Sequence, residues 1–197
     1  MNAGSRLDRA QAAGFPVAGE PLAVDLADTI ITSRDPNADL LPDEATCRLW
    51  WGLQRDRLPA SPPPPLAPTV ELRYAIRHIL DAHIAGAAPD RAAIDCVNDV
   101  AASVTSSRRL VQTPTGWTAV TVGQAPADRP YALALAATAE SLIDLLVGPA
   151  AERLRRCQNP TCSMLFVASD ARRKFCTQNI CANRTRVARH YQRHRPG

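Results

Sequence analysis

The segment from Cys157 to Cys181 reads CQNPTCSMLFVASDARRKFCTQNIC and contains two matched cysteine pairs, separated by thirteen residues. Each pair has four residues between its cysteines, and the Asn159-Pro160 step favours a turn within the first. Structural zinc takes four ligands at tetrahedral corners, and thiolates suit such a metal. We therefore expect one structural zinc ion, bound by Cys157, Cys162, Cys176 and Cys181.

Two other interpretations of the four cysteines remain open, namely ordinary buried thiols and an iron–sulfur cluster. A module of this length has little apolar core, so zinc should contribute directly to its folding. We expect its small centre to include Phe166, Phe175 and Tyr191. Cys47 and Cys96 each stand alone on a predicted helix and are interpreted as buried free thiols.

Charge divides the chain into an acidic body and a basic tail. Residues 1–150 hold twelve basic and seventeen acidic residues, a net charge of −5, whereas residues 151–197 hold eleven and two, a net charge of +9. A basic tail of this kind points to an anionic partner such as nucleic acid. Arginine suits phosphate because its planar fork makes two parallel hydrogen bonds.

The arginines of the tail cluster around and after the cysteines. A helix from residue 183 to 195 would pack through Val187 and Tyr191 and turn an arginine stripe outward. Some arginines near the ligands, such as Arg155 and Arg156, have an alternative role in neutralising a zinc tetrathiolate or pairing with the acidic body. The candidate nucleic-acid contacts are Arg172, Arg173, Arg184, Arg186, Arg189 and Arg193.

The body is expected to be mainly helical. Residues 1–20 lack period and are expected to be flexible, and residues 61–68 are proline-rich and read as an extended spacer. Residues 20–31 fit either a short strand or a helix start. The predicted elements are helices at 42–58, at 69–85 between a Thr69 cap and Gly86, at 90–104 and at 129–147, and a β-hairpin at 109–123.

At the level of whole motifs the chain resembles two known families. Cys157-x4-Cys162-x3-Phe166, then Arg172 to Cys176, then Cys181-Ala-Asn-Arg184, resembles the CGNR zinc finger. Upstream, Gly19-x2-Leu22-x2-Asp25-Leu26-x-Asp28-Thr29 resembles the start of the ABATE domain. Ala182 departs from the glycine of the CGNR pattern, and Asp28 stands where asparagine is usual, but every ligand is present.

The resemblance implies three parts and a fold class. The parts are a flexible segment at 1–20, an ABATE-like helical domain at 21–150 and a CGNR-like zinc finger at 151–197. The fold is then mainly α with a small β-hairpin, joined to a treble-clef or zinc-ribbon-like module. Such proteins are considered stress-induced transcription regulators, with the zinc module as the nucleic-acid reader.

We therefore expect a zinc-dependent, bacterial-type transcription regulator that contacts DNA through its basic C-terminal helix. The alternatives are an RNA-binding protein, or a zinc-dependent protein-interaction module whose helical body senses a ligand. Asp25 and Asp28 are candidates for a ligand pocket in that body, with helix capping or surface solvation as the other interpretation. The body's signal, a small molecule or a protein, is not indicated by the sequence.

The remaining expectations concern chemistry and location. No histidine lies in a nucleophile or metal-ligand motif and no glycine-rich phosphate loop occurs, so we do not expect an enzyme. A secretory signal and a long apolar run are both missing from the sequence, so we expect a cytoplasmic protein without a membrane partner. A homodimer is expected because single basic helices bind specific sites weakly unless paired.

Overall fold

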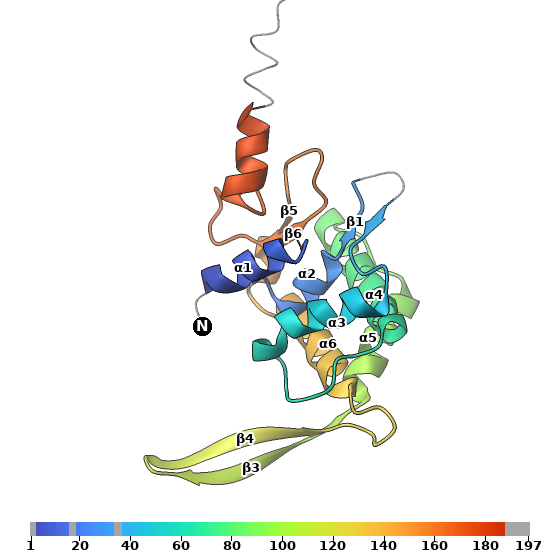
Figure 1. The fold of residues 1–197 in the computed structure, drawn as a ribbon, viewed down its shortest axis with the longest axis vertical. Helices are drawn as coiled ribbons and strands as arrows, with labels where there is room; N and C mark the ends of the chain where they lie inside the picture. Colours follow the sequence, from blue (N-terminus) through green and yellow to red (C-terminus); the bar gives the residue numbers. More distant parts are fainter. Residues whose placement is uncertain (1–2, 16–18, 34–36, 188–197) are drawn as a thin grey trace, which may run out of the picture.

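The computed structural model describes residues 3–15, 19–33 and 37–187, and it shows a helical body with a projecting β-hairpin and a four-cysteine module (Figure 1). This arrangement confirms the predicted fold class. In the part of the chain that is described, no helix is long and apolar enough to cross a membrane. The helices are α1 (Ala3–Ala12), α2 (Leu22–Ala27), α3 (Glu44–Leu53), α4 (Leu66–Ala85), α5 (Arg91–Ala102) and α6 (Ala132–Val147).

Helix α2 lies at the centre of the body. All six of its residues are buried, and it packs against both α4 and α6. Helix α5 covers the other side of the α4–α6 pair, and α3 closes the core with the edge-to-face rings of Trp50 and Trp51. The residues from Glu20 onward, for which both a strand and a helix were open, thus form a helix, followed by the short strand β1 (Ile30–Ile31) paired with β2 (Ala38–Asp39).

The N-terminal segment and the start of α4 differ from the sequence prediction. Where residues 1–20 were expected to be flexible, α1 packs against α3 and buries Ala10, with Phe15 buried just beyond it. Helix α4 begins at Leu66, three residues before the predicted cap, so Pro68 lies in its first turn, where a missing N–H costs little. Thr69 instead accepts a hydrogen bond from Trp51 Nε1 at 3.0 Å.

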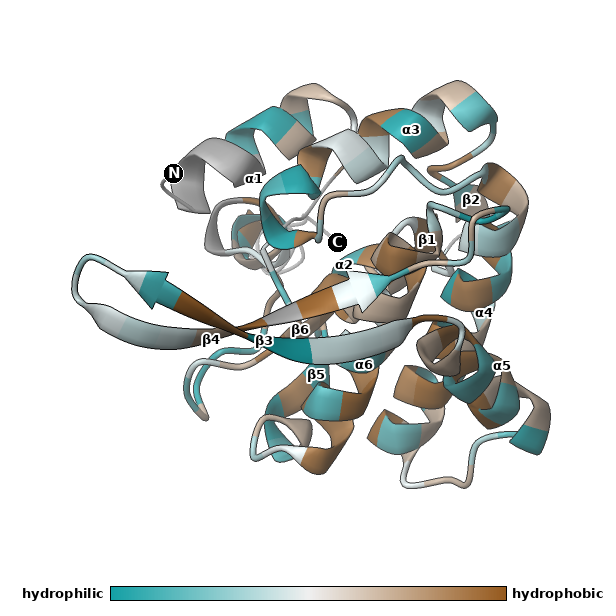
Figure 2. Ribbon diagram, turned by 90° about the horizontal axis from the view of Figure 1, so that it is seen from below, coloured by the Kyte–Doolittle hydropathy of each residue, from teal (hydrophilic) through white to brown (hydrophobic). Residues whose placement is uncertain are grey.

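The hairpin is longer than predicted and stands away from the body. Strands β3 (Thr105–Thr113) and β4 (Gly116–Gln124) pair antiparallel in one continuous register from Thr105↔Gln124 to Thr113↔Gly116. Gly116 has a φ of +131°, a conformation that favours glycine at the tight turn. Figures 1 and 2 show the hairpin reaching out from the body near the N-terminal end of α6.

The C-terminal module is attached to the body by its own small ribbon. A 3₁₀ turn, η2 (Ala151–Arg153), leads into β5 (Leu154–Arg156), which pairs antiparallel with β6 (Leu165–Val167). Leu154 and Leu165 belong to the hydrophobic core of the body, whereas Phe166 belongs to a second cluster together with the cysteines. One face of the ribbon therefore packs in the core of the body, and the other packs in the cluster around the cysteines.

Candidate metal centre

The β5–β6 ribbon positions the first cysteine pair. Cys157 follows β5 directly, and its backbone N–H donates to the Met164 carbonyl at 2.9 Å. Within the connecting turn, Cys162 N–H donates to the Asn159 carbonyl at 2.9 Å, and the Asn159 side chain accepts from the Thr161 N–H at 3.1 Å. The Asn159-Pro160 step is thus part of a turn, as predicted, and it turns both sulfurs to the same side.

The second pair is positioned by the start of the terminal helical segment. Cys176 precedes the single π turn η3 (Gln178–Ala182), and Cys181 lies within it. The Thr177 hydroxyl caps this turn by accepting from the Cys181 N–H at 3.3 Å. One pair on a ribbon turn and one pair at a helix start is the ligand arrangement of treble-clef modules.

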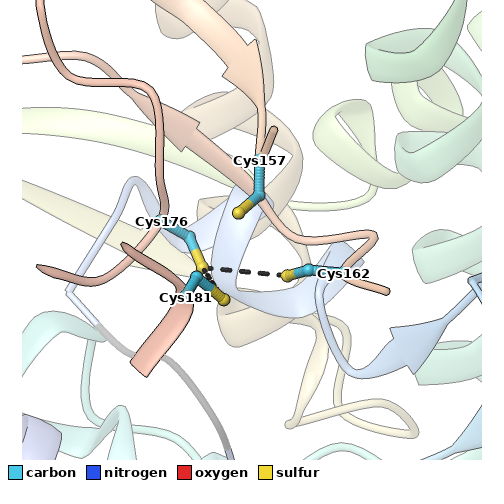
Figure 3. A group of neighbouring side chains, drawn as sticks. All are labelled: Cys157, Cys162, Cys176 and Cys181. Atoms are coloured by element: carbon cyan, nitrogen blue, oxygen red, sulfur yellow. Dashed lines mark hydrogen bonds between the residues drawn. The ribbon is translucent and has the colours of Figure 1, made fainter. Parts of the chain in front are cut away.

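The four sulfurs converge on one point (Figure 3). They all lie within 4.8 Å of one another, with 3.8 Å between the Cys162 and Cys176 sulfurs and 3.5 Å between those of Cys176 and Cys181. A regular tetrahedron with zinc–sulfur bonds of about 2.3 Å has edges of about 3.8 Å. The donor set and its spacing both fit a single zinc ion, so the four cysteines form one structural zinc site.

The ionisation of the cluster explains why it requires a cation. The Cys162 and Cys176 thiols can donate hydrogen bonds to the Cys157 sulfur, which lowers the pKa of Cys157 to about 2. The same Cys157 sulfur raises the pKa of Cys162 to about 12 and also raises the pKa of Cys176, because further thiolates would face the first one. Four thiolates at this separation require a divalent cation among them to offset their repulsion.

Arg173 supports the metal centre from its outer side. Its guanidinium lies over the buried Phe166 ring, 4.5 Å from the ring centroid. It donates to the carbonyls of Val167 and Cys176 at 3.0 and 2.8 Å, and it pairs with the Glu20 carboxylate of the body at 2.9 Å. This arginine, a predicted nucleic-acid contact, is therefore committed to contacts within the molecule.

Asp28 and Arg77 form a buried polar link between the body and the module. Both Asp28 carboxylate oxygens accept from the Leu165 N–H at 3.0 Å, and Arg77 lies 3.5 Å from the same carboxylate. Arg77 also donates to the Ser163 carbonyl at 2.8 Å, immediately after the first cysteine pair. Burial raises the pKa of Asp28 well above its usual range, with the Leu165 N–H and Arg77 opposing that rise.

Asp25 has a different set of partners on the same side of α2. It accepts from the Gly19 N–H at 2.9 Å and pairs with Arg57 of the 3₁₀ turn η1 (Arg55–Arg57). Burial raises its pKa to about 6, and Arg57 is the largest opposing influence. Asp25 and Asp28 are each about 2% exposed, so the surface-solvation interpretation is wrong. Their carboxylates contact protein groups, namely backbone N–H groups and the guanidiniums of Arg57 and Arg77.

The remaining predicted nucleic-acid contacts divide by location. Arg172, Arg184 and Arg186 are exposed, the last two on residues 183–187, which are helical and follow η3 directly. Val187, which was expected to pack against the module, is 46% exposed. Arg189, Arg193 and Tyr191 lie outside the described residues.

Sequence reasoning missed the polar links of the module. Glu20, Arg57 and Arg77 were not recognised as structural partners, although Arg77 stands one residue from the predicted apolar face of its helix. A charged residue at the edge of an apolar stripe is the signal that could have identified it. Its partners Asp28 and Ser163 are 49 and 86 residues away in the sequence, so their identity could not be predicted.

Fold and metal centre together describe a helical domain joined to a zinc finger, and comparison with known families agrees. Residues 20–149 match the ABATE family, described as "Putative stress-induced transcription regulator", and residues 153–194 match the CGNR zinc finger. No curated protein matches the sequence. Since the ABATE match alone covers more than half of the chain, this protein belongs to the ABATE family and carries a C-terminal CGNR zinc finger.

Proposed function

We propose that the protein is a cytoplasmic, zinc-dependent regulator of transcription that contacts duplex DNA through its C-terminal module and is not an enzyme. The observation that carries the proposal is the position of Arg184 and Arg186. Both side chains are exposed on the helical residues that follow the zinc ligand Cys181. The zinc site thus fixes the start of a segment that presents arginine to solvent.

Charge in the same region supports an anionic partner. Residues 171–197 contain eight basic residues and no acidic one. The exposed side chains of Arg172 and Lys174 precede Cys176, so basic groups flank the metal centre on both sides of the second cysteine pair. Contacts of this kind to phosphate give affinity that falls steeply as salt rises. Arg189 and Arg193 continue the basic sequence, and we include them in the proposed interface.

Two features favour duplex DNA over a single strand. The module offers few aromatic side chains for stacking on bases, and Phe166 is already buried beneath Arg173.

Arg173 itself is left out of the proposed interface because its guanidinium binds Glu20 and two backbone carbonyls. Removing Arg173 should therefore perturb the module rather than a phosphate contact.

The test compares paired arginine substitutions by fluorescence anisotropy with labelled duplex DNA, duplex RNA and single strands across a salt series. We expect R184A/R186A to bind duplex DNA at least tenfold more weakly and to lower the salt slope by about two. The control R48A/R91A removes two exposed arginines of the body and should bind as wild type does. Equal binding by R184A/R186A and wild type would refute the assignment, and tighter binding to RNA would replace DNA as the partner.

A further inference from the structure

The β3–β4 hairpin, residues 105–124, is called the arm here, and it exposes apolar side chains that the described part of the body leaves uncovered. Leu110 and Trp117 are 71% and 67% exposed, and Val111 and Val120 are 38% and 40% exposed. An isolated two-stranded hairpin is only marginally stable in water, and grouped exposed apolar residues mark interaction sites. The arm therefore has the character of a surface that is completed by a partner.

The charges of the arm limit what that partner can be. Arg108 and Arg109 are its only charged residues. Both are exposed, and among the described residues neither guanidinium has an ion-pair partner. Adjacent strand residues point to opposite faces, so each face of the arm carries one arginine together with apolar neighbours. The matching surface should combine carboxylates with exposed apolar groups.

Such a surface lies on the outer side of α6. Glu140, Ile143, Asp144 and Val147 are spaced at i, i+3, i+4 and i+7 and therefore share one helix face, which we call the α6 stripe. Ile143 and Val147 are 36% and 80% exposed, and in the described part of the chain neither acid has an ion-pair partner. A groove of about 370 Å³ includes both acids in its lining and runs beside the stripe.

We propose that the arm of one molecule docks on the α6 stripe of a second copy, and that the contact is reciprocal in a twofold symmetric dimer. Each face of the arm presents one arginine beside exposed apolar groups, and the stripe presents two carboxylates beside Ile143 and Val147. Nine strand residues span about 30 Å and the sixteen residues of α6 span about 24 Å, so their lengths are compatible. In a reciprocal contact, one face of the arm and the α6 stripe are covered in both copies.

Within one molecule the two surfaces are not placed to meet. A side chain on Gly123, near the base of the arm, would lie 2.6 Å from Leu133 Cδ2 at the start of α6, so the base packs there. From this point the arm extends outward (Figures 1 and 2), whereas the stripe runs along the body toward Val147 at the other end of α6. The arm of a second copy can approach the stripe without this constraint.

Nucleic acid is the less favoured partner for the arm. The arm and the helical residues 183–187 leave the body at opposite ends in Figure 1, so a short duplex held by one would not lie along the other. The exposed carboxylates of the α6 stripe would also repel a phosphate backbone near this side of the body. A second copy, in contrast, supplies opposite charge.

Charge-reversal substitutions in the full zinc-loaded chain test the proposal. Sedimentation velocity over a concentration series measures the dimer dissociation constant of each variant. We expect wild type to dimerise and both R108E/R109E and E140R/D144R to weaken the dimer at least tenfold. A mixture of those two variants should form heterodimers, and the quadruple variant should again form homodimers, because opposite charges then meet at each contact. The control R48E/R91E reverses two exposed arginines elsewhere and should dimerise as wild type does.

The mixture and the quadruple variant distinguish loss of the dimer contact from misfolding of a variant. Zinc content and far-UV circular dichroism confirm the fold of each variant, and recovery in the mixture cannot come from unfolded protein. A wild-type protein that stays monomeric at the highest concentration overturns the proposal. So does a dimer that R108E/R109E leaves unchanged, or an R108E/R109E variant that loses duplex DNA binding while remaining as dimeric as wild type.

Discussion

The body and the zinc module are stabilised by different means. The body buries whole helices, and α2 has every residue inside the core. The module has a small apolar cluster around Phe166 and Met164, and its four cysteines make up much of the remainder. Between the two lies a seam of polar contacts, chiefly the buried ones of Asp28 and Arg77 and the half-buried ones of Arg173. Apolar burial alone therefore does not explain how the module folds.

The largest expected effect is the loss of the metal. Cys176→Ser removes one of four ligands, and structural zinc contributes on the order of 10 kcal/mol to the folding of such modules. We expect the variant to lose its equivalent of zinc by elemental analysis and to unfold the module at a temperature where the body keeps most of its helix. The matched control is Cys96→Ser, since Cys96 lies on α5 outside the cluster and should leave zinc content unchanged.

A Cys176→Ser protein that holds a full equivalent of zinc, with an unchanged melting curve, would break the comparison. It would mean that the module is held by its protein contacts alone. Addition of a strong chelator to the wild type should reproduce the effect of the substitution without any change of sequence.

The second prediction concerns the seam. Arg77→Met removes the cation beside Asp28 and the donor to the Ser163 carbonyl, and breaking a buried ion pair costs about 3–5 kcal/mol. Urea denaturation should show this loss together with earlier release of zinc to a chromogenic chelator. Arg91→Met is the control. Arg91 forms an exposed i,i+4 pair with Asp95, and Arg77 forms a half-buried i,i+4 pair with Asp81 in addition to its buried contacts. Loss of the exposed pair should cost no more than about 1 kcal/mol.

The sequence was most informative where chemistry is local. Cysteine spacing predicts the metal site because each pair is a single turn, and Gly86 ends α4 in the left-handed conformation that favours glycine. The hairpin and the helices from Asp90 onward also follow from local pattern. These features depend on neighbours within a few residues, which a sequence displays directly.

Long-range partners could not be predicted from the same patterns. The arginines near the zinc ligands look alike in the sequence, yet Arg173 points inward to Glu20, 153 residues away, and Arg172 is exposed. Likewise, alternation in the hairpin favours one buried face, but the body covers neither face along most of its length. Which side of an element meets the core is a property of the assembled fold.

A third prediction uses the pH dependence of stability to distinguish the contribution of the seam from that of the zinc ion. Asp25 accepts hydrogen bonds from the backbone N–H groups of Gly19 and Glu20. These bonds position Glu20, whose carboxylate pairs with Arg173. The pKa of Asp25 is raised to about 6 by burial, so its contribution to stability is fully present below about pH 4 and is lost as the pH rises through about 6. A pKa rise of this size corresponds to roughly 3 kcal/mol.

The measurement is the free energy of unfolding of wild type minus that of Asp25→Asn, from pH 4 to 7. We expect this difference to fall by about 3 kcal/mol across the range, because asparagine does not titrate. Zinc loss at acid pH affects both proteins and largely cancels in the difference. A flat difference would show that Arg57 keeps Asp25 ionised throughout, and the carboxyl carbon shift of Asp25 in an NMR titration gives the midpoint independently.

The smallest effects should be confined to the body. Gly86 has a φ of +66° with open space around its Cβ position, so Gly86→Ala costs about 1 kcal/mol of backbone strain alone. Gly52 lies inside helix α3, also with open space, and Gly52→Ala should stabilise by up to about 1 kcal/mol. Both changes should appear in thermal unfolding while zinc affinity stays constant, since neither residue lies near the seam. A matching change in zinc affinity would show instead that the body and the module unfold as one unit.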